Sequence, residues 1–552
     1  MPGTNFNHGV EVALVNDQAP PVRTVKTSII GMVGTAGKGA VLTPKLFAGN
    51  RRAVYDEFGT YAGDGQGFTI PEGAAGMFEQ GGVTVVFINV CDPATHVTAI
   101  VGEEIALNSV TGKGYTAKPY HTTTLNITKI GATVPIAQPA RTWTVPTGVT
   151  ITKVSLTKGG AAIASGPGSG EYSISGGVLT LGTIYSATTS IYIEYTATLV
   201  KDTDYTVDQE TGLITRISAS TKLLIGAELT LNYSYVDPTK VVEADVLEGI
   251  ALLSTVAATV RAKPRILMAP RFDQTASVST ANAVLSALNT QAKIMGARVL
   301  GGCPETTKEA AAIHASFFGG DEDRVSVHFP MHIVSLPNGT EGSVPAQYRW
   351  AGLRAVLDND SGFWVSESNH TLRGILRNSL PLSHGTDAAG SGGIETDTNY
   401  LNERGVTTTV FDDAVAIGRG SSFKLWGNRQ ANQTFLSVQR TADMVNESIM
   451  LATRHAVDRN ITRGLIAYVL EEVRSYLRSL EARGAILPNP NPERVEDVWA
   501  DPDLNTEATV ALGELYIDYR FNPPSPAERI VFQAHLTTDY ISAVFTRDLA
   551  SA

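Results

Sequence analysis

Residues Arg265–Pro330 read "RILMAPRFDQTASVSTANAVLSALNTQAKIMGARVLGGCPETTKEAAAIHASFFGGDEDRVSVHFP". Three short apolar runs, RILMAP, RVLGG and RVSVHFP, are separated by two longer segments of helical spacing, TANAVLSALNTQAKIMG and TKEAAAIHASFFGG. Strands that alternate with helices form a parallel sheet with right-handed crossover connections. The sequence therefore predicts an α/β domain with a parallel sheet, which we place at 241–410 together with the amphipathic run that ends at Arg261.

A second α/β pattern lies upstream, in 22–101. Val25–Val33 and Val83–Val90 are near-continuous apolar runs, which are typical of strands buried on both faces. A Gly-rich, helix-like segment, PEGAAGMFEQGG, lies just before the second run. We expect a small α/β unit here, as the first part of a core domain.

Between 102 and 240 the composition changes to Thr, Ser, Val, Ile and Tyr with frequent Gly, and helical spacing disappears. Such a pattern predicts short antiparallel strands, so we expect an inserted β-sandwich-like domain. An internal repeat is also visible: EYSISGGVLTL (171–181) matches DYTVDQETGLIT (204–215), and IYIEYT (191–196) matches LTLNYS (229–234). The repeat predicts one sandwich built from related halves, or two small sandwiches.

The C-terminal third predicts helices followed by strands. One helix is expected from Thr441 to about Ala456 and a second from Ile461 to Arg483, with Gly484 as its stop. The second helix carries an apolar stripe at helical spacing: Ile461, Leu465, Val469, Val473, Leu477 and Leu480. Two alternating strands are expected at Leu512–Phe521 and Arg529–Thr537. We assign 411–537 as the second part of an α+β core domain built from both chain ends.

The two ends of the chain are predicted to be extended arms, 1–21 and 538–552. The first contains a single stretch of period two, with Val10, Val12 and Leu14 on one face. A lone strand of this kind needs a partner sheet, because its backbone hydrogen-bonding groups are otherwise unpaired.

Length and charge restrict the class of protein. The 552 residues suggest roughly three or four domains. The 54 acidic and 43 basic residues give a net charge of −11, which argues against general nucleic-acid binding. The two cysteines, Cys91 and Cys303, predict no disulfide framework or metal cluster. The first twenty residues lack a signal-peptide pattern and no apolar run is long enough to span a bilayer, so we expect neither secretion by that route nor membrane insertion.

One motif invites a protease hypothesis. HGTDAAG at His384–Gly390 is similar to the sequence around a subtilase catalytic histidine. A subtilase also needs a Ser that opens a later helix in a Gly-Thr-Ser setting, and no Gly-Thr-Ser follows His384. We therefore predict that the chain has no catalytic residues, and we keep a subtilase-like hydrolase only as an alternative.

Other chemical motifs are also incomplete. GMVGTAGKG at Gly31–Gly39 follows a strand, but Gly39 stands where a phosphate loop needs Ser or Thr, so we interpret it as a turn. His328 and His332 flank Pro330 in a strand-like run and cannot share a helical face as metal ligands. Several acidic residues could be cast as an acid/base pair or a cation site, and we interpret them as solvated loop acids: Asp358, Asp360, Glu367, Asp412 and Asp413.

Five segments together resemble one family, that of the phage contractile tail sheath proteins. They are HGVEVALV (8–15), TSIIGMVGTA (27–36), AGLRAVLDNDSGFWVSESNHTLRG (351–374), LNERGVTTTV (401–410) and FKLWGNRQ (423–430). They occur in the family's order, and the resemblance leaves out 102–240. It implies a subtilisin-like fold for 241–410 and a structural protein that needs no cofactor.

The resemblance also implies an assembly. Subunits of this family form stacked six-membered rings around an inner tail tube, and contraction drives the tube through a target envelope. Arms from neighbouring subunits are expected to complete the C-terminal sheet. The arm residues would be Val10, Val12, Leu14, Tyr540, Ile541, Val544 and Phe545. The receiving sheet would contain Ile517, Tyr519, Phe521, Ile530 and Phe532.

The helix at Ile461–Arg483 is expected to face the tube, which makes Arg454, Arg459 and Arg463 candidate tube contacts, although the same arginines could simply solvate an exposed face. Implied partners are further copies of the chain, the inner tube protein, and baseplate and tail terminator proteins, with location in the virion tail after assembly in the bacterial cytoplasm. A virion surface adhesin carried by the β-insertion remains an alternative. A phage tail, a tailocin and another injection device fit the sequence equally.

Overall fold

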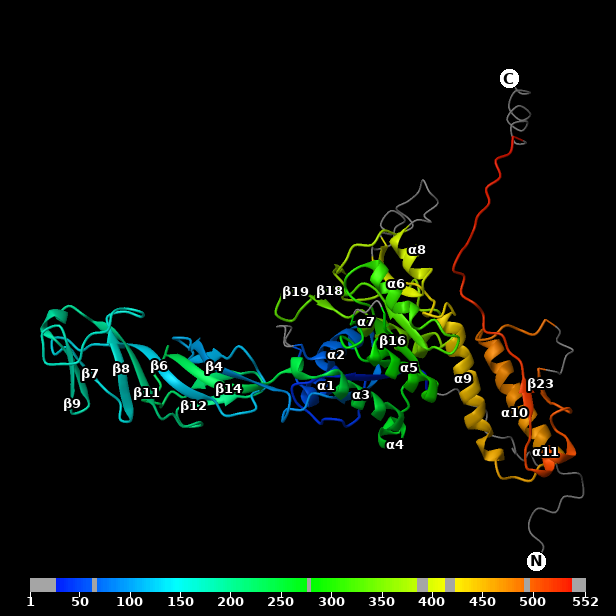
Figure 1. Cartoon of the computed structure of the whole chain (residues 1–552), viewed down its shortest axis with the longest axis horizontal. Coiled ribbons are helices and arrows are strands. Elements are labelled where there is room, and N and C mark those ends of the chain that lie inside the picture. The colour runs from blue at the N-terminus through cyan, green and yellow to red at the C-terminus, as the bar shows by residue number, and fades with distance from the viewer. Residues whose placement is uncertain are drawn as a thin grey trace, which may run out of the picture. The chain divides into compact units, whose positions relative to one another are not determined.

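A computed structural model of the chain describes residues 26–61, 67–275, 279–384, 396–412, 422–490 and 497–538 (Figure 1). These residues fall into two compact units, 26–434 and 435–538. The first unit combines an α/β sheet with an all-β insertion, and the second is mostly helical. In the part of the chain that the structure describes, no helix is both long enough and apolar enough to cross a membrane.

An eight-stranded sheet forms the centre of the first unit. Its strands in spatial order are β2 (Lys45–Ala48), β3 (Thr84–Asn89), β1 (Ile29–Gly34), β15 (Ile266–Met268), β16 (Arg298–Gly302), β17 (Val325–His328), β21 (Val406–Asp412) and β22 (Ser422–Trp426). The six strands from β3 to β21 run parallel, and the outer strands β2 and β22 are antiparallel to their neighbours. The predicted parallel strands of 265–330 are confirmed as β15, β16 and β17.

The first α/β segment belongs to this same sheet, which corrects the predicted core domain made of 22–101 and 411–537. Ile30 of β1 pairs with Val85 of β3 on one side and with Ile266 of β15 on the other. All six residues of β1 are buried. A strand that is apolar on both faces needs a neighbour on each side and helices on both faces, and the strands after 265 supply that neighbour.

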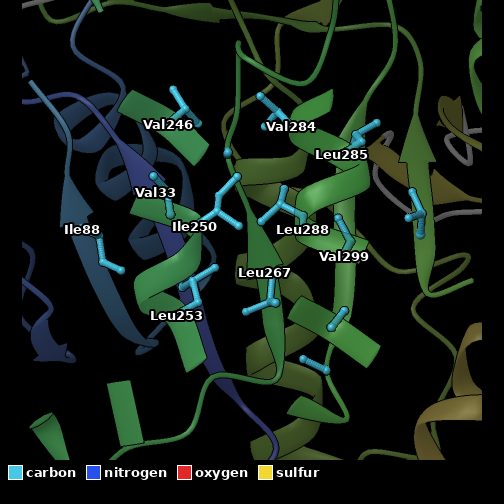
Figure 2. Close-up of a cluster of buried hydrophobic side chains, with 14 of the residues drawn as sticks. Val33, Ile88, Val246, Ile250, Leu253, Leu267, Val284, Leu285, Leu288 and Val299 are labelled. Carbon is cyan, nitrogen blue, oxygen red and sulfur yellow. The ribbon is translucent and has the colours of Figure 1, made fainter. Parts of the chain in front are cut away.

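Helices cover both faces of the sheet. On one face, α3 (Glu243–Ala251) and α5 (Ala283–Met295) direct their apolar side chains at the strands (Figure 2). Figure 2 labels ten side chains of this cluster. The two helices contribute Val246, Ile250, Val284, Leu285 and Leu288, the turn after α3 contributes Leu253, and the strands contribute Val33, Ile88, Leu267 and Val299. This cluster is the main core of the first unit.

The other face is covered by α2 (Thr69–Gln80) and α7 (Gln347–Asp360), which cross at close range. Glycines make the crossing possible. A Cβ atom on Gly352 would lie 2.6 Å from the Met77 carbonyl oxygen, and one on Gly73 would lie 2.8 Å from the Tyr348 ring. Neither distance leaves room for a side chain, so the Gly-rich PEGAAGMF pattern serves helix packing.

The segment Ala351–Gly374, which carries the family resemblance, is built around a buried ion triad. The Arg354 guanidinium contacts Asp358 at 2.7 Å and Glu367 at 3.0 Å, and its side chain is fully buried. It also donates to the carbonyls of Val365 and Gly362. The interpretation of Asp358 and Glu367 as solvated loop acids is therefore wrong, because both carboxylates neutralise a buried cation.

An all-β insertion follows β3. Its five-stranded antiparallel sheet has the order β4 (Val97–Ala106), β14 (Glu228–Val236), β6 (Asn126–Pro135), β11 (Ser190–Ala197) and β8 (Val149–Ser155). Two three-stranded sheets accompany it: β7 (Thr142–Thr144), β10 (Val178–Leu181) and β9 (Tyr172–Ser175), and β12 (Tyr205–Asp208), β13 (Leu213–Arg216) and β5 (Lys113–Tyr115). One continuous hydrophobic cluster contains residues of all three sheets, so they share one core, which favours one sandwich over two small ones.

The predicted internal repeat corresponds to equivalent elements of that sandwich. The hairpins β9–β10 and β12–β13 are the first repeated motif, and β11 and β14 are the second. β11 and β14 lie on opposite sides of β6, and each contains a buried tyrosine, Tyr195 and Tyr233. One copy of the repeat, β6 to β11, is therefore inserted in the sequence of the other copy, between its strands β5 and β12.

The other described elements of the first unit are short. They are α1 (Arg51–Phe58), η1 (Thr183–Tyr185), η2 (Pro238–Lys240), η3 (Leu252–Thr255), α4 (Val256–Val260), α6 (Lys308–Ser316), β18 (His332–Ser335), β19 (Glu341–Val344), β20 (Arg377–Asn378) and α8 (Asp397–Asn402). The strands β19, β18 and β20 form a small antiparallel sheet.

Candidate assembly interface

Two helices form most of the second unit. α9 spans Leu436–Ala452 and continues into the 3-10 turn η5 (Thr453–Ala456), and α10 spans Arg463–Ala482. The Thr462 hydroxyl accepts a hydrogen bond from the Leu465 amide at 3.2 Å and so caps the start of α10. Gly484, with a φ of 74°, follows its last turn as predicted.

The apolar stripe of α10 is largely buried. Its buried members are Val469, Val473, Tyr476, Leu477 and Leu480, whereas the predicted members Ile461 and Leu465 are half-buried. Arg474 donates to the Val498 carbonyl at 2.7 Å and ties the helix to a strand. One face of α10 therefore supports a small sheet, while charged residues occupy the other face.

That sheet has only two strands in the described residues, β23 (Val498–Ala500) and β24 (Ile517–Tyr519). The predicted strand Leu512–Phe521 is thus much shorter than expected, because the short helix α11 (Glu507–Ala511) precedes it. Ile517 and Tyr519 lie on β24 as predicted, and Phe521 follows it. The Tyr519 hydroxyl donates to the Asn446 side chain at 2.8 Å, which joins β24 to α9.

The predicted second strand, Arg529–Thr537, does not form among the described residues, so Ile530 and Phe532 do not belong to the β23–β24 sheet of this subunit. Within the described residues the segment 520–538 forms no helix or strand. Pro523, Pro524 and Pro526 lack the amide donors that a hairpin would need. Ile530 is 71% exposed and Phe532 is 91% exposed, so their alternating apolar pattern packs on no sheet of the described residues.

The candidate tube-contact arginines lie within one short, exposed stretch of the chain. Arg454 is in η5, Arg459 is in the turn that follows, and Arg463 opens α10; all three are exposed. Three exposed apolar side chains lie in the same α9–η5–α10 segment: Met450, Leu451 and Val457. The segment therefore presents a mixed basic and apolar surface, of the kind that protein interfaces use.

The predicted arm residues all lie outside the described residues: Val10, Val12, Leu14, Tyr540, Ile541, Val544 and Phe545. The part of the chain next to the C-terminal arm is described up to 538 and is already extended and exposed at 529–537.

The histidines that suggested a hydrolase or a metal site, His384, His328 and His332, each contact other side chains of the first unit. His384 packs its ring on Trp426 with centroids 4.8 Å apart, and the rest of the HGTDAAG motif lies outside the described residues. His328 and His332 are buried, and the side-chain oxygen of Thr409 lies 2.8 Å from Nε2 of each ring. Burial lowers the pKa of His328 to about 3, so this histidine is neutral and serves as a hydrogen-bonding core residue.

Of the remaining acidic candidates, Asp360 is exposed to solvent and Asp412 forms an ion pair. Asp360 is exposed, as the interpretation of a solvated acid predicts. Asp412 pairs with Lys424 at 2.5 Å across the β21–β22 hairpin, and Asp413 lies outside the described residues. Among the described residues, no group of three or more His, Cys, Asp or Glu side chains could hold a metal ion.

Comparisons with known proteins agree on one group. The phage tail sheath C-terminal domain family matches residues 430–537, which include all but the last described residue of the second unit. The tail sheath protein of Burkholderia phage BcepMu is 29% identical over 560 residues, covering 97% of this chain and 98% of that protein. A prophage major tail sheath protein of Pseudomonas aeruginosa is 32% identical over 289 residues, covering 51% of this chain and 67% of that protein.

Similarity of fold extends over the whole chain. A chain in the solved structure of the anti-feeding prophage baseplate in its contracted state aligns with 98% of this chain and 99% of its own length. The TM-score is 0.52 and the sequence identity is 12%, so this match concerns the fold alone.

Proposed function

The chain belongs to the phage tail sheath protein family, and from this premise we propose that its second unit is the surface through which copies of the chain join into a sheath. Like its relatives, the chain is a structural component of a phage tail and not an enzyme. We propose further that copies form six-membered rings, stack around an inner tube, and contract to drive that tube through a cell envelope.

The distribution of exposed apolar side chains carries the proposal. Of the 25 large apolar side chains that are exposed in the described part of the chain, 11 lie in 435–538. This range holds only about a fifth of all the described residues. They include Leu504, Leu512 and Tyr516 near the small sheet, and Ile530, Phe532 and Leu536 in the terminal segment. Such a concentration is expected where a second protein surface binds.

Strand addition explains why the terminal segment is left open. A two-stranded sheet of three residues per strand is too small to be stable by itself, and among the described residues no further strand pairs with either outer edge. The segment Arg529–Thr537 has the alternation of a strand but forms no strand among the described residues. We propose that it adds to the β23–β24 sheet of a neighbouring copy, and that the arm at 1–21 does the same. In this proposal Ile530 and Phe532 are donated residues, whereas Ile517 and Tyr519 receive.

The same arrangement supports a mechanism for contraction. Donated strands would keep neighbours linked while the first units slide and rotate, and the work would come from the free-energy difference between two packings of the same subunits. This proposal needs no cofactor. The parallel strands and crossover helices of 241–410 support the proposed subtilisin-like arrangement. Baseplate and tail terminator proteins would bind the ends of the sheath, after assembly in the bacterial cytoplasm.

The strand-addition proposal is tested with two matched double variants. Ile530→Asp with Phe532→Asp places charges on the apolar face of the segment, and Gln533→Asp with His535→Asp places them on the next part of the same segment, where the residues are already polar. All four side chains are exposed in the subunit, so both variants should melt at the wild-type temperature. Electron microscopy at high protein concentration should show hollow cylinders for the control and dispersed subunits for the first variant. Cylinders of normal length from the first variant would rule out this segment as the donated strand.

The tube contact is tested separately with Arg459→Glu and Arg463→Glu. We expect normal cylinders from this variant alone, and loss of sheath growth on purified tail tubes, because reversed charges repel the surface that the arginines attract. Arg51→Glu with Arg52→Glu, two exposed arginines of α1, is the control. If the first variant coats tubes as well as the control does, these arginines do not contact the tube.

A further inference from the structure

The glycine-rich loop GMVGTAGKG forms a socket for one side chain of the insertion. A Cβ atom on Gly37 would lie 2.4 Å from Cδ2 of Tyr120, and one on Gly59 would lie 2.1 Å from the Tyr120 hydroxyl oxygen. Real Cβ atoms do not approach other atoms this closely, so both positions must be glycine for the ring to fit. Gly37 follows β1 and Gly59 ends α1, so the socket belongs to the α/β part of the first unit.

The ring is held on a further side by an aromatic contact. Phe68, which precedes α2, meets the Tyr120 ring edge to face, with centroids 5.2 Å apart and planes at 84°. Tyr120 is 6% exposed and belongs to the hydrophobic cluster of the α/β sheet. Aromatic pairs in this geometry are more favourable than their buried area alone would suggest.

The backbone of Tyr120 belongs to the insertion. Its carbonyl accepts a hydrogen bond from the Val236 amide at 3.0 Å, at the end of β14, and the next residue, His121, forms a bridge with Tyr235. Tyr120 has a φ of 56°, a left-handed conformation that is unfavourable for a side chain of this size. Such a conformation persists only where the surrounding contacts determine it. The contacts here come from both parts of the first unit.

We propose that Tyr120 is a latch that fixes the insertion to the α/β sheet, so that the two move as one body. A second contact between the parts, the ion pair of Lys38 with Glu210 at 2.7 Å, is exposed and contributes little. Other described contacts lie at the connections themselves: His96, just before β4, is 3.2 Å from the Asp245 carboxylate of α3, and Val236, at the end of β14, belongs to the cluster of the α/β sheet. Connections of this kind act as hinges when no contact farther from them holds the two parts together.

The hydrophobic cluster of the insertion does not include Tyr120. Removing the ring should therefore release the insertion without unfolding it. The inference concerns the single subunit and holds whether or not the subunit assembles as proposed above.

The latch is tested by a distance measurement across the two parts. Spin labels are placed at Asp56→Cys on α1 and Ser173→Cys on β9, both exposed positions, while the native Cys91 and Cys303 are buried and stay unlabelled in the folded protein. We expect a single narrow distance distribution for the otherwise unchanged chain. Tyr120→Gly, which accepts the left-handed backbone without strain, should broaden the distribution by at least about twofold.

A second variant and a control separate the latch from other effects. Gly37→Ala fills the socket at a backbone conformation that alanine can adopt, and it should broaden the distribution as Tyr120→Gly does. Gly82→Ala also adds one methyl group to the α/β part, but with no atom within 4 Å, and should leave the distribution narrow. Hydrogen exchange of the β6 and β11 amides shows whether the insertion stays folded. An unchanged width in both test variants, or loss of protection in β6 and β11, would overturn the proposal.

Discussion

The buried carboxyl group of Asp273 should make the subunit less stable at neutral and alkaline pH than its Asn variant. Asp273 follows β15 and is fully buried. Its Oδ2 accepts hydrogen bonds from the Gly302 amide and the Gln347 side chain, each at 3.0 Å, while Oδ1 has no hydrogen-bond partner. Burial is the largest influence on this group, and it raises the pKa of Asp273 from 3.8 to about 7.

The sign and size of the effect follow from that pKa. The folded state binds the proton more tightly than the unfolded state does, so this group's contribution to stability is complete below pH 3.8 and is lost as the pH rises to about 7. The raised pKa corresponds to about 4 kcal/mol, since one pKa unit is worth about 1.4 kcal/mol. Asp273→Asn removes the charge and retains an oxygen that can accept both hydrogen bonds. Its free energy of unfolding should exceed that of the wild type by up to about 4 kcal/mol at pH 8.5 and by little at pH 4.

Urea unfolding followed by tryptophan fluorescence, to which the buried Trp350 contributes, measures this difference at the two pH values. Asp321→Asn is the control, because it removes an exposed acid from the same unit and should change stability by less than about 0.5 kcal/mol. A variant that is equally or less stable than the wild type at pH 8.5 would refute the reasoning. A gain of the same size at both pH values would also refute it, because the gain would then have nothing to do with the proton.

Two further predictions concern the core of the first unit. Because burial lowers the pKa of His328 from 6.5 to about 3, this residue should cost about 3 kcal/mol of stability as the pH falls from 7 to 4.5, and His328→Asn should flatten that slope in acid unfolding curves. Gly352→Ala should lower stability by about 1–3 kcal/mol, because its methyl group would meet the Met77 carbonyl oxygen at 2.6 Å, whereas Gly464→Ala, with only the Thr462 hydroxyl at 3.9 Å, should be neutral or slightly stabilising in thermal melts.

Local sequence patterns predict which segments of this chain form helices and strands, but they do not predict which strands lie side by side. The alternation in 265–330 correctly predicts three parallel strands, because a helical period and a strand period differ within a few residues. The position of β1 between β3 and β15 cannot be read in the same way. Its partner Ile266 lies more than two hundred residues away, and an apolar run indicates that a strand is buried without naming the strand beside it.

The candidate interface shows the same limit. Spacing correctly predicts four of the six stripe residues, Val469, Val473, Leu477 and Leu480, and Gly484 follows the last turn of α10 as expected. The alternation at Arg529–Thr537 indicates a strand equally well, but alternation does not show whether the partner strand belongs to the same subunit or to another. The interpretation of Asp358 and Glu367 as solvated acids fails for a related reason, because the arginine that neutralises them is identified only once α7 and the following loop are folded together.

In open α/β sheets, ligands bind beside the carboxyl ends of the strands, at the point where the order of the strands reverses. Here that point lies between β1 and β15, since the chain passes from β1 to β3 on one side and later to β15 on the other. The site is occupied by the chain's own side chains: Arg271 forms two hydrogen bonds with Glu72, at 2.9 and 2.6 Å, and the Tyr348 hydroxyl donates to Glu72 at 3.0 Å. These contacts join the loop after β15 to α2 and α7. The edge of the sheet that holds a ligand in enzymes of this architecture here joins three elements to one another, as the contraction proposed above would require of a subunit.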